Sequence, residues 1–280
     1  GDVSESICEF ELELESGAPE RLFDLASEIG KVVPFRLATE SKASRGYALF
    51  TQEEPQPRKY VKLNLSKDDT VEQVLTELVQ HCLDHLRANE DVVLKTDNAE
   101  GVHQMRVALR RLRAALRLFK SSLPGDQYGW AVAEAKWLTA ELSAPRAWDV
   151  FADEFVAPVA GLCKEDQGVD ALWAAVEQAR KQSRQRARDA IGMERYTEFL
   201  LRLSAWLSGQ AWRDQPVTAR TTRLLDPIGD HCVKLLRKRD RNVRKQGQDI
   251  ATLSAAIAAK RHRAKDMAAF LRTEPFWHDA

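Results

Sequence analysis

The sequence lacks the short motifs that accompany several common catalytic sites. It contains no G-x-x-x-x-G-K-[ST] phosphate loop, no H-E-x-x-H zinc motif and no G-x-S-x-G nucleophile elbow. The reaction classes that depend on these motifs therefore gain no support. We predict no catalytic residue, no metal site and no cofactor.

The chain is also poor in cysteine, and its cysteines are far apart. Cys8, Cys82, Cys163 and Cys232 form no C-x-x-C pair, which argues against a zinc or redox site. Because each lies in an apolar-periodic segment, we expect reduced core residues and a cytoplasmic protein. No apolar run approaches the length of a membrane span and no secretory signal is present, so we expect no membrane association.

The chain has no excess of either charge, because 42 basic residues balance 42 acidic ones. This balance hides segregation: residues 1–60 carry 12 acids and 7 bases, so the remainder of the chain has a net charge of +5. Clustering of charge matters more to a ligand than the total does. The useful question is where the bases gather.

They gather most densely in residues 101–120, GVHQMRVALRRLRAALRLFK, which hold six bases and no acid. On a helix of 3.6 residues per turn, one histidine and four of these arginines fall in a stripe roughly 80° wide: His103, Arg106, Arg110, Arg113 and Arg117. Arginines three or four positions apart repel one another by a few tenths of a kcal/mol per pair. A solvent-exposed helix face usually has interleaved acids, so this stripe favours a polyanionic ligand.

The same helix has a neighbouring apolar face. It consists of Met105, Leu109, Leu112, Leu116 and Phe119, which we predict to be core. We expect the helix to begin at Asp97, as N-cap, with Glu100 completing an acidic variant of the capping box. The basic stripe would then lie beside a packed face, at the mouth of a groove between helices.

Residues 102–119, read as V-H-x-M-R-V-x-x-R-R-L-R-x-x-L-x-x-F, resemble the signature of CHAD domains, the conserved-histidine α-helical domains. The resemblance implies an all-helical fold of two four-helix bundles with a basic cavity between them. It also implies an association with inorganic polyphosphate.

An internal repeat at a shift of 150 residues points to the same architecture. His81-Cys82 recurs as His231-Cys232, and Arg110-Arg111-x-Arg113 recurs as Lys260-Arg261-x-Arg263. We therefore predict a mainly α protein whose CHAD region, 67–280, has halves of about 67–165 and 166–280 related by a pseudo-two-fold. The second copy has Leu253 and Ala256 in place of His103 and Arg106, so the halves cannot contribute equally.

We expect a small α/β segment at residues 1–50. Residues 7–15 alternate between acidic and mostly apolar positions and predict a strand. An amphipathic helix over 18–29 and a basic loop with a short strand over 41–50 follow. This combination resembles the C-terminal part of a CYTH domain, a triphosphate tunnel enzyme that often precedes a CHAD domain. With too few strands to close a tunnel, we interpret 1–50 as a fragment without triphosphatase activity and 51–66, which contains Pro55 and Pro57, as a linker.

The rest of the chain has helical periodicity. We predict helices over 69–89, 98–120, 126–143, 146–162, 169–191, 194–209, 220–246 and 248–271. Further bases lie in rows on the predicted helices over 169–191, which includes Arg180, and 220–246, which includes Arg244. Arg146 lies in P-R-A-W-D-V, similar to the family's R-D-x-D-V with Ala147 in place of the first Asp.

The candidate polyphosphate-binding residues are His103, Arg106, Arg110, Arg111, Arg113, Arg117, Arg146, Arg184, Arg188, Arg237, Arg241, Lys260, Arg261 and Arg263. Arginine suits this ligand because its planar fork can engage two phosphate oxygens at once. His103 could either donate a hydrogen bond to phosphate or have a structural role against a neighbouring helix. The other candidates, His81, His85 and His231, could lie in the core.

Our leading hypothesis is non-catalytic binding of inorganic polyphosphate, with a cytoplasmic location associated with polyphosphate granules. A nucleic-acid-binding protein is the first alternative, although aromatic residues are not interleaved with the basic rows as a stacking platform requires. Hydrolysis of triphosphate or polyphosphate, resting on residues 1–50, is the second. The oligomeric state and the preferred length of the polyphosphate chain stay open.

Overall fold

The computed structural model describes residues 4, 6–120, 123, 125–163, 166–209, 224–234 and 237. The chain divides into one unit of residues 1–225 and another of residues 226–280. In the second unit, residues 228–234 are helical and Lys234 forms an ion pair with Asp226, with 2.9 Å between Nζ and Oδ2. All the helices that follow belong to the first unit.

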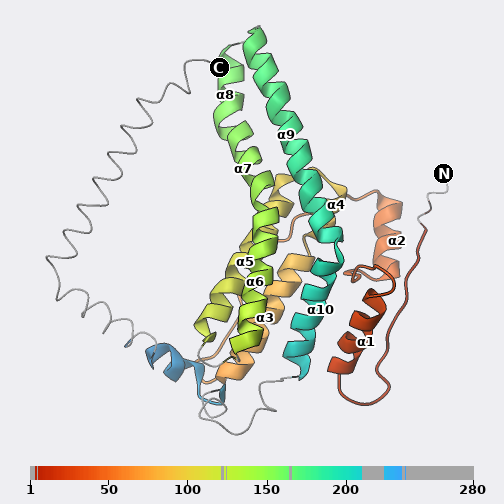
Figure 1. Cartoon of the computed structure of the whole chain (residues 1–280), viewed down its shortest axis with the longest axis vertical. Coiled ribbons are helices and arrows are strands. Elements are labelled where there is room, and N and C mark those ends of the chain that lie inside the picture. Colours follow the sequence, from red (N-terminus) through yellow and green to blue (C-terminus); the bar gives the residue numbers. More distant parts are fainter. Residues whose placement is uncertain are drawn as a thin grey trace, which may run out of the picture. The chain divides into compact units, whose positions relative to one another are not determined.

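A four-helix bundle forms the centre of the first unit. Its helices are α3 (Val71–Arg87), α5 (Ala99–Leu118), α6 (Gly125–Glu141) and α10 (Glu194–Gly209). Each contacts two others, so that α3 packs on α5, α5 on α6, α6 on α10 and α10 on α3 (Figure 1). The helix α10 belongs to the predicted second half of the chain, yet it completes a bundle with three helices of the predicted first half.

The core of this bundle comes from the apolar faces that the periodicity predicts. Met105, Leu109, Leu112, Leu116 and Phe119 of the α5 segment are at most 1% exposed, which confirms the predicted core face. Burying a side chain of this size contributes about 1.5–3 kcal/mol to the free energy of unfolding. The prediction succeeds because a stripe of large apolar residues at 3.6-residue spacing can be buried only against other helices.

The short helix α4 (Glu90–Lys95) was not predicted, and it packs closely on the first turn of α5. Gly101 permits this approach, because a Cβ atom added there would lie 2.7 Å from Cγ1 of Val92. Such a distance is far below an ordinary carbon–carbon contact. The glycine therefore sets the distance between α4 and α5.

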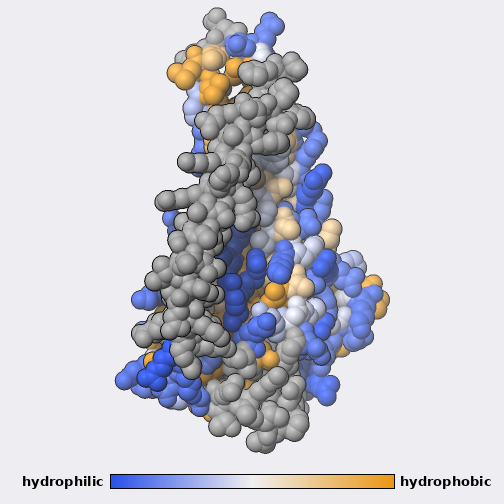
Figure 2. All heavy atoms as spheres, turned by 60° about the vertical axis from the view of Figure 1, so that its left-hand side comes forward, coloured by the Kyte–Doolittle hydropathy of each residue, from blue (hydrophilic) through white to orange (hydrophobic). Residues whose placement is uncertain are grey.

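A second layer consists of α7 (Ser143–Phe151), a π-helical turn (Ala152–Val156), α8 (Ala157–Leu162) and the long helix α9 (Gln167–Gly192). The run from α7 to α8 lies beside α9 (Figure 1). Phe155, Val159 and Leu162 are exposed, and an apolar cluster is visible at the end of the first unit where α8 lies (Figure 2). Trp148 is also exposed, and its ring packs edge-on against that of Phe151, with 5.9 Å between the ring centroids.

The N-terminal segment differs most from its prediction. It contains α1 (Glu20–Gly30), which confirms the predicted amphipathic helix, and α2 (Lys42–Thr51) where a loop and a strand were expected. Residues 7–15 form no strand, and no strand occurs anywhere in the described part of the chain. Alternation alone was insufficient because a strand needs a neighbour to satisfy its backbone groups. The helix α2 forms because Ser41 caps it, accepting a hydrogen bond of 3.1 Å from the Ser44 amide.

The remaining predictions have mixed outcomes. The helices predicted over 69–89, 98–120, 126–143, 146–162, 169–191 and 194–209 are present, with the fourth divided by the π-helical turn. The helix predicted over 248–271 and most of that over 220–246 lie outside the described residues. For this reason the internal repeat and the paired bundles stay predictions.

Two of the four cysteines contradict the expectation of a core position. Cys8 and Cys163 are exposed, whereas Cys82 is buried and Cys232 is half-buried; none is in a disulfide. Cys8 is exposed because the strand predicted to bury it does not form. Among the described residues, no helix combines the length and apolar character needed to cross a membrane.

Candidate polyanion site on α5

The predicted basic stripe lies on α5 as expected, and we call it the α5 row: His103, Arg106, Arg110, Arg113 and Arg117. Arg110 and Arg117 are exposed, while the other members are half-buried. Among the described residues, none of the four arginines is in an ion pair with a carboxylate. Their charge is therefore left for solvent or a ligand to neutralise.

The guanidinium group of Arg106 is the most constrained of the row. Nη1 donates a hydrogen bond to the Ser143 hydroxyl and lies 3.5 Å from the Thr139 carbonyl oxygen. Burial lowers the pKa of Arg106, and the nearby charges of Arg146 and Arg110 lower it further. The structure thus brings Arg146 of α7 close to Arg106 and Arg110 of α5, which lie about forty residues away in sequence.

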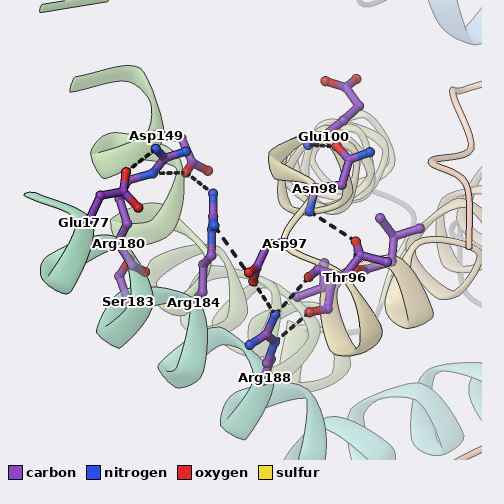
Figure 3. A network of polar contacts seen from close by, with 12 residues as sticks. Thr96, Asp97, Asn98, Glu100, Asp149, Glu177, Arg180, Ser183, Arg184 and Arg188 are labelled. Atoms are coloured by element: carbon purple, nitrogen blue, oxygen red, sulfur yellow. Dashed lines mark hydrogen bonds and ion pairs between the residues drawn. The ribbon is translucent and has the colours of Figure 1, made fainter. Parts of the chain in front are cut away.

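Three further arginines form what we call the α9 row: Arg180, Arg184 and Arg188. Unlike the α5 row, every member is in an ion pair with an acid (Figure 3). Asp149 Oδ1 accepts hydrogen bonds from Arg180 Nε at 3.1 Å and from Arg184 Nη2 at 2.7 Å. Arg180 also donates to Glu177 at 2.6 Å. The Asp149 side chain is only 1% exposed, so this is a buried ion-pair cluster.

Arg188 links α9 to α4 and to the connection between α4 and α5. Its Nε donates to the Val93 carbonyl at 3.0 Å, and Nη2 donates to the Thr96 carbonyl at 2.9 Å and to Asp97 Oδ1 at 2.8 Å (Figure 3). Arg184 and Arg188, both predicted phosphate ligands, are therefore already engaged by the protein. They hold α9 against the body of the first unit.

These contacts correct the predicted start of α5. The N-cap is Asn98, whose side chain accepts a hydrogen bond of 3.0 Å from the Glu100 amide, and not Asp97. Asp97 instead binds Arg188. In the sequence, an aspartate next to a helix start can be either the N-cap or the partner of an arginine on another helix. Only the position of α9 decides that Asp97 is the partner of Arg188.

Arg111, another predicted phosphate-binding residue, lies on a different face of α5 from the α5 row. Its guanidinium carbon lies 3.2 Å from the centroid of the Tyr60 ring, on the side of α5 that faces α3. The helix places Arg111 about 100° around the axis from Arg110. Arg111 is therefore not part of the α5 row, although the two residues are adjacent in sequence.

The histidines divide between core and surface. His85 and His231 are buried, which confirms that these two can be core residues, while His81 and His103 are half-buried. His85 Nε2 lies 2.9 Å from the Arg58 carbonyl oxygen and 3.1 Å from Gln104 Oε1, so this nitrogen carries the proton. Burial lowers the pKa of His85, so it is neutral near pH 7.

The other predicted ligands lie in the C-terminal part of the chain. Arg237 is exposed in the second unit. Arg241, Lys260, Arg261 and Arg263 lie outside the described residues. In the ranges that are described, no group of three or more His, Cys, Asp and Glu side chains is placed to hold a metal ion.

Comparison with known proteins identifies the family. The CHAD domain family matches residues 77–273, which is most of the chain. The chain belongs to the CHAD family. It is also similar to the CHAD domain of the plant Ricinus communis, known from a crystal structure, with 32% sequence identity and a TM-score of 0.48. That match covers 56% of this chain and 52% of the plant chain, about half the length of each.

Sequence reasoning missed the role of Asp149. The P-R-A-W-D-V segment was noted for Arg146, yet its aspartate is the buried acceptor for Arg180 and Arg184. The resemblance to R-D-x-D-V contained this signal. No comparable signal pointed to the contact of Tyr60 with Arg111, since nothing in the sequence places residues 51–66 against α5.

Proposed function

We propose that this CHAD protein binds inorganic polyphosphate along the α5 row. The observation that carries the proposal is the convergence of Arg106, Arg110 and Arg146, which come from two helices and are in no ion pair with a carboxylate within the described residues. Three cations held close together repel one another. A ligand with one negative charge per repeating unit would relieve that repulsion at each of them.

The geometry also supports a smaller set of phosphate-binding side chains than the sequence suggested. We propose the α5 row and Arg146 as the groups that contact phosphate, and Arg184 and Arg188 as groups that hold α9 in place. The predicted second half of the chain contributes five further proposed phosphate-binding side chains: Arg237, Arg241, Lys260, Arg261 and Arg263.

Polyphosphate presents only oxygens, so its receptor needs cationic donors along a line and no group that reads bases. Nucleic acids gain much of their affinity from stacking on aromatic rings. The rings of Trp130 and Trp137 carry the guanidinium groups of Arg202 and Arg195 at 4.1 and 4.2 Å. These rings lie on α6, and no aromatic ring is stacked on a described member of the α5 row. This favours polyphosphate over a single-stranded nucleic acid.

We propose that residues 1–50 are a CYTH-like fragment that does not hydrolyse triphosphate. Glu9 is engaged by Lys42 and Arg45, and Glu11 by Lys42 at 2.7 Å. Carboxylates engaged in this way are poorly placed to hold a catalytic metal ion. We also propose a cytoplasmic location at polyphosphate granules.

A competition titration tests the proposed ligand. We expect long-chain polyphosphate to displace single-stranded and duplex DNA of equal phosphate content at about 150 mM salt, with affinity that falls steeply as salt increases. Pyrophosphate should bind much more weakly because it spans one or two arginines. DNA binding that equals or exceeds polyphosphate binding would refute the proposal.

A further inference from the structure

Residues 58–61, which we call the strap, lie along α3 in an irregular, extended segment. The strap is held mainly through its backbone. The Arg58 amide donates to Asn89 Oδ1 at 3.0 Å, and the Arg58 carbonyl accepts from Asn89 Nδ2 at 3.0 Å. His81 Nε2 lies 2.7 Å from the Val61 carbonyl oxygen. Asn89 and His85, the second partner of the Arg58 carbonyl, are both buried, so these contacts are well defined.

Tyr60 is the side chain that the strap places over α5. Its ring packs edge-on against His81 and His85, with ring centroids 4.8 and 6.0 Å apart. The face of the same ring is covered by the guanidinium group of Arg111. Burial raises the pKa of the Cys82 thiol to about 11, and the charge of Arg111 opposes this rise, which places Arg111 on the α3 side of the helix.

The contact holds the guanidinium group of Arg111, whose side chain is otherwise exposed, on the α3 side of α5 and away from the α5 row. A guanidinium group stacked on a ring gains a modest free energy from the electrons of that ring, and its planar face is shielded from an anion. A phosphate chain that binds the α5 row passes within one helical turn of Arg111, but the guanidinium group is held against Tyr60 on the neighbouring side of the helix. The strap precedes residue 77, where the match to the CHAD family begins, whereas Arg111 lies inside the match.

We propose that the strap is an autoinhibitory contact, in which Tyr60 holds Arg111 on the α3 side of α5 and must leave before this arginine can turn toward the α5 row and bind phosphate there. The inference rests on the proposed binding of polyphosphate to α5. Release of Tyr60 would extend the cationic surface from the α5 row around the helix toward His81. Polyphosphate can engage Arg111 only in molecules whose strap is open. The apparent affinity is therefore the affinity of the open form multiplied by the fraction of molecules in that form.

A double-mutant cycle tests the strap. Tyr60→Leu keeps apolar bulk against the histidines but removes the ring, and we expect it to tighten polyphosphate binding about three- to tenfold. Arg111→Ala should change the affinity little when Tyr60 is present and about tenfold in the Tyr60→Leu background. Calorimetry at two salt concentrations measures both, and the Leu variant should show a steeper salt dependence because one more cation is engaged.

Tyr60→Phe is the matched control, because it keeps the ring and should bind as the unmodified protein does. Equal effects of Arg111→Ala in both backgrounds would overturn the strap, and so would weaker binding by Tyr60→Leu. Binding that depends on Arg106 and Arg110 while the cycle shows no coupling would refute the strap alone. Absence of polyphosphate binding in the unmodified protein would refute the proposed function together with the strap.

A second measurement needs no substitution. Hydrogen exchange at the Arg58 amide reports the strap, since this N–H is bonded to Asn89. Saturating polyphosphate should make this amide exchange several-fold faster as the strap opens, while amides in the middle of α3 stay protected. Slower exchange at Arg58 on binding would mean that the strap closes on the ligand, contrary to the proposal.

Discussion

The α5 and α9 rows are alike in sequence and opposite in structure. Both place arginines three or four residues apart on one helix face. In the α9 row, all three arginines are in ion pairs with Asp149 or Asp97, from outside α9, whereas no carboxylate pairs with the arginines of the α5 row in the described part of the chain. Periodic arginine therefore marks either a clamp between helices or a surface for an anion. The neighbouring helices decide which.

The largest expected effect tests whether the α5 row binds polyphosphate. Arg106→Ala combined with Arg110→Ala should weaken polyphosphate binding by about a hundredfold or more, since each charge-assisted contact is worth about 1.5–3 kcal/mol. Lys260→Ala combined with Arg263→Ala should have a much smaller effect, because the second copy of the predicted repeat lacks the equivalents of His103 and Arg106. Calorimetric affinity measures both.

Both double variants should keep their helicity, because neither removes a residue of the apolar face of α5. An equal loss of affinity in the two variants would show that both halves contribute alike. The asymmetry between the copies would then be wrong, although the α5 row would still bind polyphosphate.

The next effect tests the clamp side. Asp149→Asn leaves Arg180 and Arg184, whose side chains are 14% and 13% exposed, without their shared buried carboxylate. Removing one partner of a buried ion pair costs about 3–5 kcal/mol. We expect a loss of that order in the free energy of unfolding, measured by urea denaturation.

Asp153→Asn is the matched control, since Asp153 lies 3.8 Å from Arg180 and is 61% exposed. It should change the free energy of unfolding by less than about 1 kcal/mol. If the two substitutions cost the same, Asp149 would not be the centre of a clamp, and the contrast between the rows would be lost.

The smallest expected effect concerns Glu90, a buried carboxyl that has a tyrosine as its hydrogen-bond partner in place of an arginine. Glu90 is 2% exposed and accepts a hydrogen bond of 2.6 Å from the Tyr196 hydroxyl, but Arg36 lies 3.8 Å from Oε2, too far for a hydrogen bond. Burial raises the pKa of Glu90 to about 7, although Tyr196 and Arg36 lower it. Glu90 thus lacks the close guanidinium contacts that Asp149 has.

A raised pKa in the folded state has a definite consequence for stability. Below about pH 4.5 the carboxyl is protonated in both states; as pH rises to about 7 it ionises first in the unfolded chain, so the folded state loses stability. Glu90→Gln should remove this loss and be the more stable protein at pH 8 by roughly 1–3 kcal/mol. Thermal unfolding at pH 5 and pH 8 measures the difference. A pH dependence that is unchanged in Glu90→Gln would show that Glu90 does not titrate in this range.

Much of the fold was predictable from local pattern, and the failures have identifiable causes. The helices α3, α5, α9 and α10 follow from apolar spacing, because burial of one face is specified by the residues of the helix itself. Residues 7–15 have strand-like alternation, but a strand depends on a partner that the segment cannot specify. The capping of α2 by Ser41 and the brevity of α4 were overlooked for a similar reason: short helices carry little periodic signal.

The sequence by itself determined the family, the helical class and the α5 row, because each depends on residues close together along the chain. The tertiary structure decided which arginines are left for a ligand. It brought Arg146 beside Arg106, gave Asp149 to Arg180 and Arg184, and placed Tyr60 on Arg111. These pairings join residues about 30 to 50 positions apart. Coulomb energy depends on distance in space, and spacing along the chain does not fix that distance.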